Sequence, residues 1–232
     1  MEVFNSTQYN SVTEQNKFLA RVYGWMTFAL ILSGLTAFGT AFYAQQNIQA
    51  FKTFFMGGFF IFAILELIIV FYLSARIQKI STGSAKFWFV VYSILNGFTL
   101  STIFFIYDIA SIANVFGISA LMFFIMALYG SKTKTNLMSY GKFFSMAIMG
   151  IIIASLINLF LHSSGMDFLI SIVAVVIFTG LTAYDTQKML IISRQARDND
   201  MFKKASIIGA LELYLDFINI FIRMLRIFGN RK

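Results

Sequence analysis

The chain has 232 residues, of which 59% are hydrophobic and only 12% charged, and its mean hydropathy is +0.78. A water-soluble domain of this length does not sustain such a composition, and the lack of cysteine excludes disulfides and thiol catalysis. The net charge of +8 does not indicate nucleic acid, because the basic residues lie in short loops between apolar runs, where membrane topology explains them.

Seven apolar runs of about 20 residues follow one another, and each is long enough to cross about 30 Å of hydrocarbon as a helix. The alternating pattern of a membrane barrel is absent. The runs cover residues 22–44, 54–75, 87–107, 109–130, 143–161, 168–190 and 207–228. The sequence therefore predicts an all-α polytopic membrane protein, with one seven-helix domain at residues 22–232 after a polar cytoplasmic segment at residues 1–21.

The distribution of basic residues predicts a cytoplasmic amino terminus. In that orientation nearly all basic loop residues fall inside and only Lys52 falls in an outer loop, as the positive-inside rule requires. Arg226, Arg231 and Lys232, which follow the middle of the seventh run, would then lie outside. A re-entrant seventh segment would return them to the cytoplasm, whereas the length of the run favours a full span, and both alternatives stay open here.

Two aspartates interrupt the last two apolar runs. Asp185 lies in the sixth run and Asp216 in the seventh, at depths where a charged side chain is costly and normally marks a functional site. Both are about equally far from the polar turn near residues 199–200, so antiparallel helices would bring them to about the same height. Glu212 precedes Asp216 by one turn on the same helix face, and Asn219 continues that face.

Two carboxylates that share a low-dielectric site titrate as a unit, because they cannot both ionise cheaply, and such a pair could titrate near neutral pH. When ionised, the pair would offer hard oxygen ligands to Ca²⁺ or another cation, and when protonated it would hold its helices together through a shared proton. The alternative is that Ser, Thr and backbone groups or a buried arginine neutralise each aspartate. Arg76, at the end of the second run, is the obvious candidate for that arginine. The two hypotheses are compatible. An ion pair between Arg76 and an aspartate that breaks when the aspartate is protonated would act as a latch.

Other polar residues give weaker signals. Glu66, in the middle of the second run, either lines an outer vestibule or sits protonated against Ser or Thr. Arg223 is expected to snorkel outward or to pair within the bundle, and His162 is expected to be a surface residue. No phosphate loop, nucleophile elbow or metalloprotease helix is present, so we expect no enzyme activity and no tightly bound cofactor.

Two strings carry a family resemblance. TGLTAYDTQKM at residues 179–189 and LYLDFINIFIRMLRIFG at residues 213–229 resemble the two signature segments of the Bax inhibitor-1 family, also called the transmembrane Bax inhibitor motif proteins. The strings YGWM at residues 23–26 and SARIQKI at residues 74–80 agree with it, as does the spacing of the seven runs. The resemblance covers nearly the whole chain and is strongest to bacterial inner-membrane members.

The resemblance implies six helices around a central seventh, with a leak pathway for Ca²⁺ or other cations. The family's di-aspartyl pH sensor corresponds to Asp185 and Asp216, and its acidic residue in the second span corresponds to Glu66. Its arginine latch corresponds to Arg76, displaced by about one residue, while Glu212 stands where a small or neutral residue is expected. Suppression of cell death is not implied, because bacteria lack the apoptotic partners behind the family name.

The leading functional hypothesis is a pH-sensitive calcium leak channel of the bacterial inner membrane. The two aspartates would sense protons and, with Glu212 and Glu66, attract cations. The alternative is a non-conducting regulator that binds a membrane-anchored protease or another membrane complex. A proton-coupled transporter is a third hypothesis, but the inverted repeats expected of one are not seen. The expected partners are membrane lipids and calcium or other cations, and not nucleic acid.

Overall fold

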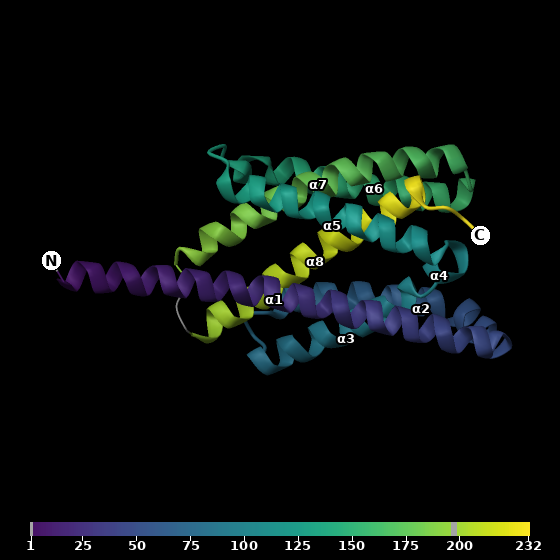
Figure 1. The fold of residues 1–232 in the computed structure, drawn as a ribbon, viewed down its shortest axis with the longest axis horizontal. Coiled ribbons are helices and arrows are strands. Elements are labelled where there is room, and N and C mark those ends of the chain that lie inside the picture. The colour runs from purple at the N-terminus through teal and green to yellow at the C-terminus, as the bar shows by residue number, and fades with distance from the viewer. Residues whose placement is uncertain (1, 196–198) are drawn as a thin grey trace. The chain divides into compact units, whose positions relative to one another are not determined.

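The computed structural model describes residues 2–195 and 199–232, with side chains at residues 12–47, 49, 61–195 and 199–232. These residues form helices almost throughout (Figure 1) and, apart from one isolated bridge, contain no β-pairing. In chain order the elements are α1 (Glu2–Gln46), α2 (Ile48–Arg76), α3 (Thr82–Leu100), α4 (Ile103–Ile106), α5 (Ile109–Lys132), the 3₁₀ helix η1 (Leu137–Tyr140), α6 (Gly141–Leu161), α7 (Ser164–Ser193) and α8 (Asp200–Phe228). The all-α prediction is confirmed.

The long helices contain the seven predicted spans. Within the described residues, six segments are long and apolar enough to cross a membrane: Val12–Gln46, Thr82–Ile106, Ile109–Lys132, Leu137–Leu161, Ser164–Ser193 and Asp200–Phe228. The second predicted span lies in α2, but the side chains of residues 54–60 are outside the described set, as is that of Lys52. Arg197, one of the basic residues that the orientation places in the cytoplasm, also lies outside the described residues. The predicted polar segment continues into the first span as one helix, α1. The chain is therefore a multi-pass helical membrane protein.

The third span is one membrane segment with a break in its helix. Helix α3 ends at Leu100 and α4 begins at Ile103. The hydroxyl of Ser101 donates to Phe98 O (2.6 Å), and that of Thr102 donates to the carbonyl oxygen three residues earlier (2.8 Å). Hydroxyls that bond to local carbonyls compete with the helix's own hydrogen bonds. Since the chain has no proline, these hydroxyls are the physical reason for the break.

The helices gather in two compact units. Unit 1 comprises Met1–Ile106, Ser193–Tyr214 and Lys232, and unit 2 comprises Tyr107–Ile192 and Leu215–Arg231. The division falls inside α8, so this helix contributes its first half to unit 1 and its second half to unit 2. Whether residues 22–232 behave as a single domain stays a prediction.

In unit 1, α3 packs against both α1 and α2 (Figure 1). Gly97 permits the close approach of α3 to α1, because a Cβ atom there would lie 2.6 Å from Thr36 Cβ and 2.7 Å from Ser33 O. Nearer its start, α1 also contacts α8, where the buried ring of Phe18 packs edge-on against Phe202 at 6.3 Å between centroids. Unit 1 is thus held by a glycine-dependent contact between helix backbones and by an aromatic pair.

In unit 2, α5 lies close to both α7 and α8. A Cβ atom on Gly130 of α5 would come within 2.7 Å of Ala183 Cα on α7, so this contact also depends on a glycine. Phe116 and Phe123 of α5 pack edge-on against Phe217 of α8, with centroids 5.2 and 5.8 Å apart. Helix α6 differs, because Ile151 is its only buried side chain and the others are half-buried or exposed.

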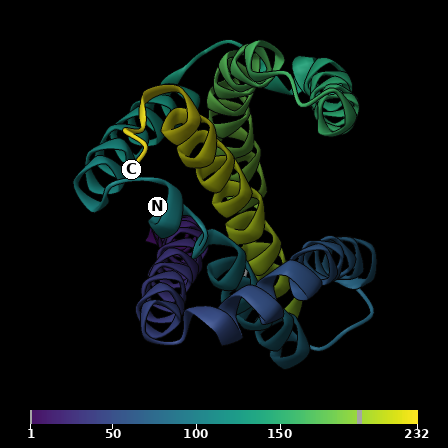
Figure 2. The ribbon, with the colours of Figure 1, turned by 90° about the vertical axis from the view of Figure 1, so that its right-hand side faces the viewer.

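The course of α8 and the tail after it bears on the seventh segment. Helix α8 is unbroken over 29 residues, about 43 Å at about 1.5 Å per residue. The residues after it pair with the link between α4 and α5: Lys232 N donates to Ile106 O (3.0 Å), and Asp108 N donates to Asn230 O (3.1 Å). Figure 2 shows this tail beside that link. A re-entrant segment would have to reverse direction, so α8 has the geometry of a full span.

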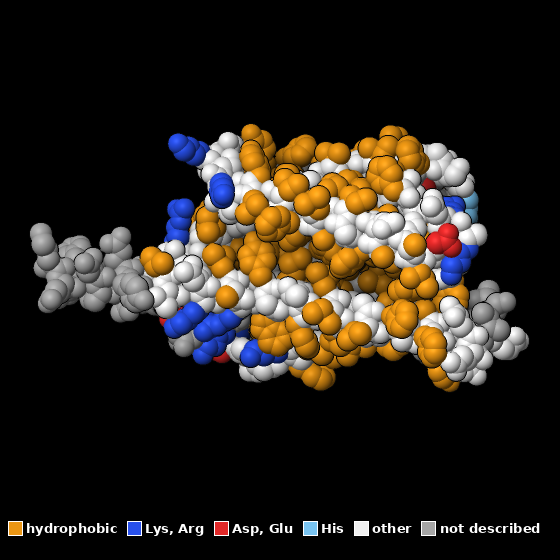
Figure 3. Space-filling model, viewed as in Figure 1, with side chains coloured by type: hydrophobic (Ala, Val, Ile, Leu, Met, Phe, Trp, Pro, Cys, Tyr) orange, Lys and Arg blue, Asp and Glu red, His pale blue; other side chains and the backbone are white. Residues whose placement is uncertain are grey.

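Exposure divides the helices into enclosed and outward-facing ones. In the most apolar stretch of α8, 67% of residues are buried, against 6% in that of α6. On the face shown in Figure 3, apolar side chains cover the lengths of the helices, while Lys and Arg side chains gather toward helix ends. This is the surface expected of a protein whose outer helices face hydrocarbon.

Candidate proton and cation site

Asp185 and Asp216 are both buried in unit 2, with 7% and 4% of their surface exposed. On α7, most residues between 181 and 189 are buried, so the helix is enclosed on nearly every side around Asp185. On α8, residues 216–218 are all buried. Neither aspartate faces outward, where lipid would surround it.

Two hydrogen bonds of Gln187, two residues after Asp185, fix this part of α7. Gln187 Oε1 accepts from Leu137 N (2.7 Å), and its Nε2 donates to Thr135 O (2.9 Å), which ties α7 to the link between α5 and α6. The hydroxyl of Thr186 is buried and has no hydrogen-bond partner among the residues that the structure describes. The turn that carries Asp185 is therefore held in place by neighbouring chain and contains a hydroxyl able to bind a further group.

The predicted face around Asp216 divides between the two units. Glu212 is half-buried in unit 1, whereas Asp216 and Asn219 belong to unit 2. The side-chain amide of Asn219 donates to Leu215 O (2.8 Å), so Asn219 bonds to its own helix. Phe217, the residue after Asp216, packs on two phenylalanine rings of α5. Asp216 thus lies in a stretch of α8 that is anchored by aromatic packing.

Glu66 lies in a hydrogen-bond network of unit 1. Its carboxylate accepts from Thr99 Oγ1 (2.9 Å) and from Asn96 Nδ2 (3.1 Å). Asn96 Oδ1 in turn accepts from the hydroxyl of Tyr214 (2.8 Å), and Ser33 Oγ lies 2.7 Å from that hydroxyl. The network joins α1, α2, α3 and α8 within unit 1. One hypothesis placed Glu66 against a Ser or Thr side chain, and Thr99 is such a neighbour. That Glu66 is protonated, or that it lines an outer vestibule, stays a prediction.

Tyr214 is a member of this network that the sequence analysis missed. It is completely buried, and its ring packs edge-on against Phe89 (6.2 Å) and Tyr92 (5.7 Å). A buried tyrosine needs a partner for its hydroxyl. Its position in an apolar run, two residues before Asp216, could have indicated a buried tyrosine. Its hydrogen-bond partners could not be predicted, because they come from distant parts of the chain.

Arg76, the predicted latch, is exposed at the last residue of α2. The turn after it is instead contacted by Lys204 of α8, whose Nζ donates to Ile80 O (3.1 Å) and to Gln78 O (3.4 Å). Lys204 also pairs with Asp200 Oδ2 at 3.1 Å. Lys204 is thus a basic contact to this turn that the sequence analysis did not identify, and the latch role of Arg76 stays a prediction.

No group of three or more His, Asp or Glu side chains that could hold a metal ion occurs in the described part of the chain. Ca²⁺ takes six to eight oxygen ligands. Two carboxylates would supply only part of that shell, and hydroxyls, carbonyls or water would have to supply the rest. Calcium binding at Asp185 and Asp216 stays a prediction.

The whole chain after its first residues matches one family of membrane proteins. Residues 15–232 fit the family described as inhibitor of apoptosis-promoting Bax1. The chain belongs to the Bax inhibitor-1 family. The resemblance drawn from the strings around Asp185 and Asp216 is thereby confirmed.

Proteins from several bacteria align with the chain along almost its whole length. The inner membrane protein YbhL of Escherichia coli strain K12 is 45% identical over 219 residues, which cover 93% of this chain and 92% of that protein. A protein of Borreliella burgdorferi is 42% identical and covers 94% of each chain. A membrane protein of Streptococcus pyogenes serotype M1 is 38% identical and covers 93% of each chain.

Proposed function

We propose that this member of the Bax inhibitor-1 family is a pH-sensitive leak channel for calcium or other cations. The observation that carries the proposal is the burial of Asp185 and Asp216 inside two membrane-spanning helices. An aspartate at the centre of a membrane helix costs about 2.5–3.5 kcal/mol on insertion scales. Apolar side chains would fill the same positions without that cost, so a role for the charge is the simpler explanation.

The chemistry of the proposal requires the two carboxyl groups to lie close enough to share a proton. With one proton between them, the pair is held together by a hydrogen bond, and without it the two charges repel each other and attract a cation. A change of pH would therefore alter the packing of α7 against α8 and the affinity of the site for cations. In the proposal, the carboxyl pair is the part of this contact that responds to pH.

The remaining acidic residues have supporting roles in the proposal. Glu66, held by Thr99 and Asn96, and Glu212, half-buried on α8, would attract cations toward the pathway. Arg76 would latch the closed state by pairing with an ionised aspartate. The protein would act without enzyme chemistry and without a tightly bound cofactor, in the inner membrane, as the name of YbhL states for that relative.

Purified protein in liposomes tests the proposal. A calcium indicator inside the vesicles should report a flux that varies with external pH for the wild type. Asp185→Asn and Asp216→Asn should each remove most of that pH dependence, because a single remaining carboxyl group has no partner with which to share a proton. Asp108→Asn is the matched control, since Asp108 is exposed at the start of α5.

Absence of calcium flux and of flux of other cations in wild-type vesicles would contradict the channel and leave the alternative, a non-conducting regulator of a membrane protease or another membrane complex. In that case the protein should co-purify with its partner from mild detergent. A pH-dependent flux that survives both asparagine substitutions would instead keep the channel and overturn the role of the aspartates.

A further inference from the structure

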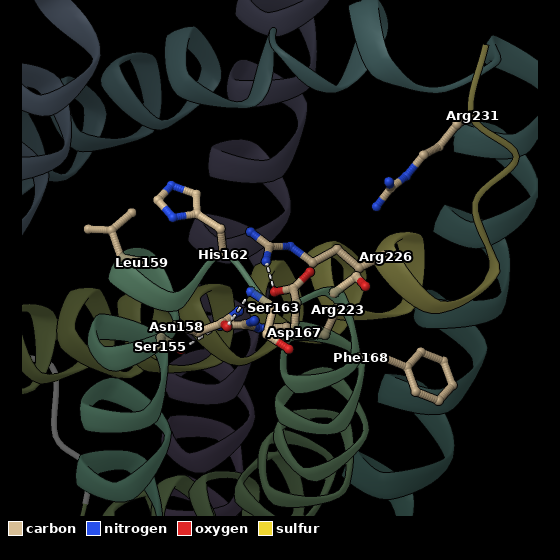
Figure 4. Close-up of a pocket in the computed structure, with 11 residues that line it drawn as sticks. Ser155, Asn158, Leu159, His162, Ser163, Asp167, Phe168, Arg223, Arg226 and Arg231 are labelled. Atoms are coloured by element: carbon tan, nitrogen blue, oxygen red, sulfur yellow. Dashed lines mark hydrogen bonds and ion pairs between the residues drawn. The ribbon is translucent and has the colours of Figure 1, made fainter.

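A polar pocket lies in unit 2, apart from the two buried aspartates. It has a volume of about 570 Å³ and is formed where α6 meets α7, beside the end of α8 and the tail (Figure 4). The side chains that line it are Ser155, Asn158, Leu159, His162, Ser163, Ser164, Asp167, Phe168, Arg223, Arg226 and Arg231. Three of them are arginines and one is an aspartate, so with a neutral histidine the pocket has an excess of two positive charges.

The single carboxylate of the pocket neutralises only part of the positive charge of the three arginines. Arg226 pairs with Asp167. Arg223 is half-buried, and its Nη2 lies 3.5 Å from the neutral hydroxyl of Ser155. Arg231 extends from the tail toward the pocket, as Figure 4 shows. Since Arg223 and Arg226 are three residues apart on one helix face, their like charges destabilise each other.

An anion between these arginines would relieve that repulsion. The planar guanidinium fork binds the oxygens of phosphate with paired hydrogen bonds, and this geometry makes arginine the preferred residue for such groups. The hydroxyls of Ser155, Ser163 and Ser164 lie on the walls and could donate to further oxygens. The chemistry of the walls therefore suits a phosphate group better than a cation or an apolar ligand.

The pocket also borders a surface suited to lipid. Leu159, Phe160 and Leu161 at the end of α6 are 52%, 83% and 61% exposed, and Phe168 and Leu169 at the start of α7 are 51% and 61% exposed. An acyl chain could cover these side chains while its headgroup reached the arginines. Basic pockets between membrane helices bind the phosphates of anionic lipids in this way.

We infer that this pocket binds a phosphate group, carried by an anionic phospholipid headgroup or present as free phosphate. The site accounts for the basic residues at the end of α8, which contradict the charge bias of the other loops. It stands independently of the channel proposal, because none of its residues belongs to the candidate cation site.

The retention of lipid by the purified protein tests the inference directly. Wild-type protein in detergent would be mixed with phosphatidylglycerol, phosphatidylcholine or inorganic phosphate, and followed by native mass spectrometry and thermal unfolding. Retained phosphatidylglycerol, with no effect of phosphatidylcholine, identifies the lipid as the source, whereas stabilisation by inorganic phosphate identifies the free anion. In either case the double substitution Arg223→Gln with Arg231→Gln should weaken binding by about tenfold or more, because two charges are lost.

Two further variants make the outcome decisive. Lys132→Gln with Lys142→Gln removes the same charge from the ends of α5 and α6 away from the pocket, and should leave binding unchanged. Arg231→Gln alone changes an exposed tail residue and keeps the test valid if loss of Arg223 impairs folding. The inference is overturned if neither phosphatidylglycerol nor inorganic phosphate binds. It is also overturned if substitution of the two lysines lowers binding as much as substitution of the two arginines.

Discussion

At the scale of single residues, the chemistry of this protein depends on a few polar groups inside apolar helices. Asp185, Asp216 and Glu66 could be identified from the sequence, because an acidic residue within an apolar run is apparent without any knowledge of the fold. The wider network around Glu66 could not, since its members Ser33 and Tyr214 meet although 181 positions separate them. Such contacts depend on how the helices pack, which no local pattern encodes.

The hydroxyl of Tyr214 gives a prediction at this scale. Tyr214→Phe keeps the ring that packs on Phe89 and Tyr92 but removes the donor to Asn96. We expect a loss of about 0.5–1.5 kcal/mol in the free energy of unfolding, typical of one hydrogen bond, measured by denaturation in detergent micelles. Tyr129→Phe, on a tyrosine that is 49% exposed, is the control. Equal stabilities of the two variants would show that the network contributes nothing measurable.

At the scale of helices, the apolar runs predicted the six candidate spans found among the described residues, because a length of about 20 residues and a lack of charge are local properties. The break between α3 and α4 could have been suspected from Thr99, Ser101 and Thr102, but hydroxyls in a run do not by themselves specify a break. The arginine pocket was beyond sequence reasoning. Its residues come from α6, α7, α8 and the tail, and the sequence showed them only as exceptions to the charge bias.

The two hydrogen bonds of Gln187 lead to a prediction for the link between α5 and α6. Gln187→Ala removes the acceptor of Leu137 N and the donor to Thr135 O. We therefore expect faster hydrogen exchange at residues 133–140, because this backbone opens more often without its clamp. Gln195→Ala, at an exposed turn after α7, should leave the exchange of that link unchanged. Unaltered exchange in Gln187→Ala would mean that packing alone holds the link.

At the scale of the whole molecule, the predicted orientation places the amino terminus inside and the carboxyl terminus outside. Seven full spans require this opposition, and α8 has the length and continuity of a full span. The basic residues near the carboxyl terminus are, with Lys52, the departures from the charge bias, and the proposed phosphate site supplies a reason for those near the terminus. The orientation itself rests on the positive-inside rule.

The absence of cysteine from the chain allows a direct test of this orientation. Full-length proteins with Asn230→Cys or Lys134→Cys would be treated in intact cells with a maleimide that does not cross membranes. Asn230→Cys should be labelled from outside, and Lys134→Cys, in the predicted cytoplasmic link after α5, only after the cells are permeabilised. Labelling of Lys134→Cys in intact cells, or protection of Asn230→Cys, would contradict the orientation.

The coupling between Asp185 and Asp216 can be measured most directly by a double-mutant cycle on the pH dependence of calcium flux. Wild type, Asp185→Asn, Asp216→Asn and the double variant would be compared in liposomes of one composition. If the two carboxyl groups share a proton, each single substitution should remove the same transition and the second should add almost nothing. Independent effects that add up in the double variant would contradict the account, because two separate carboxyl groups would then be titrating.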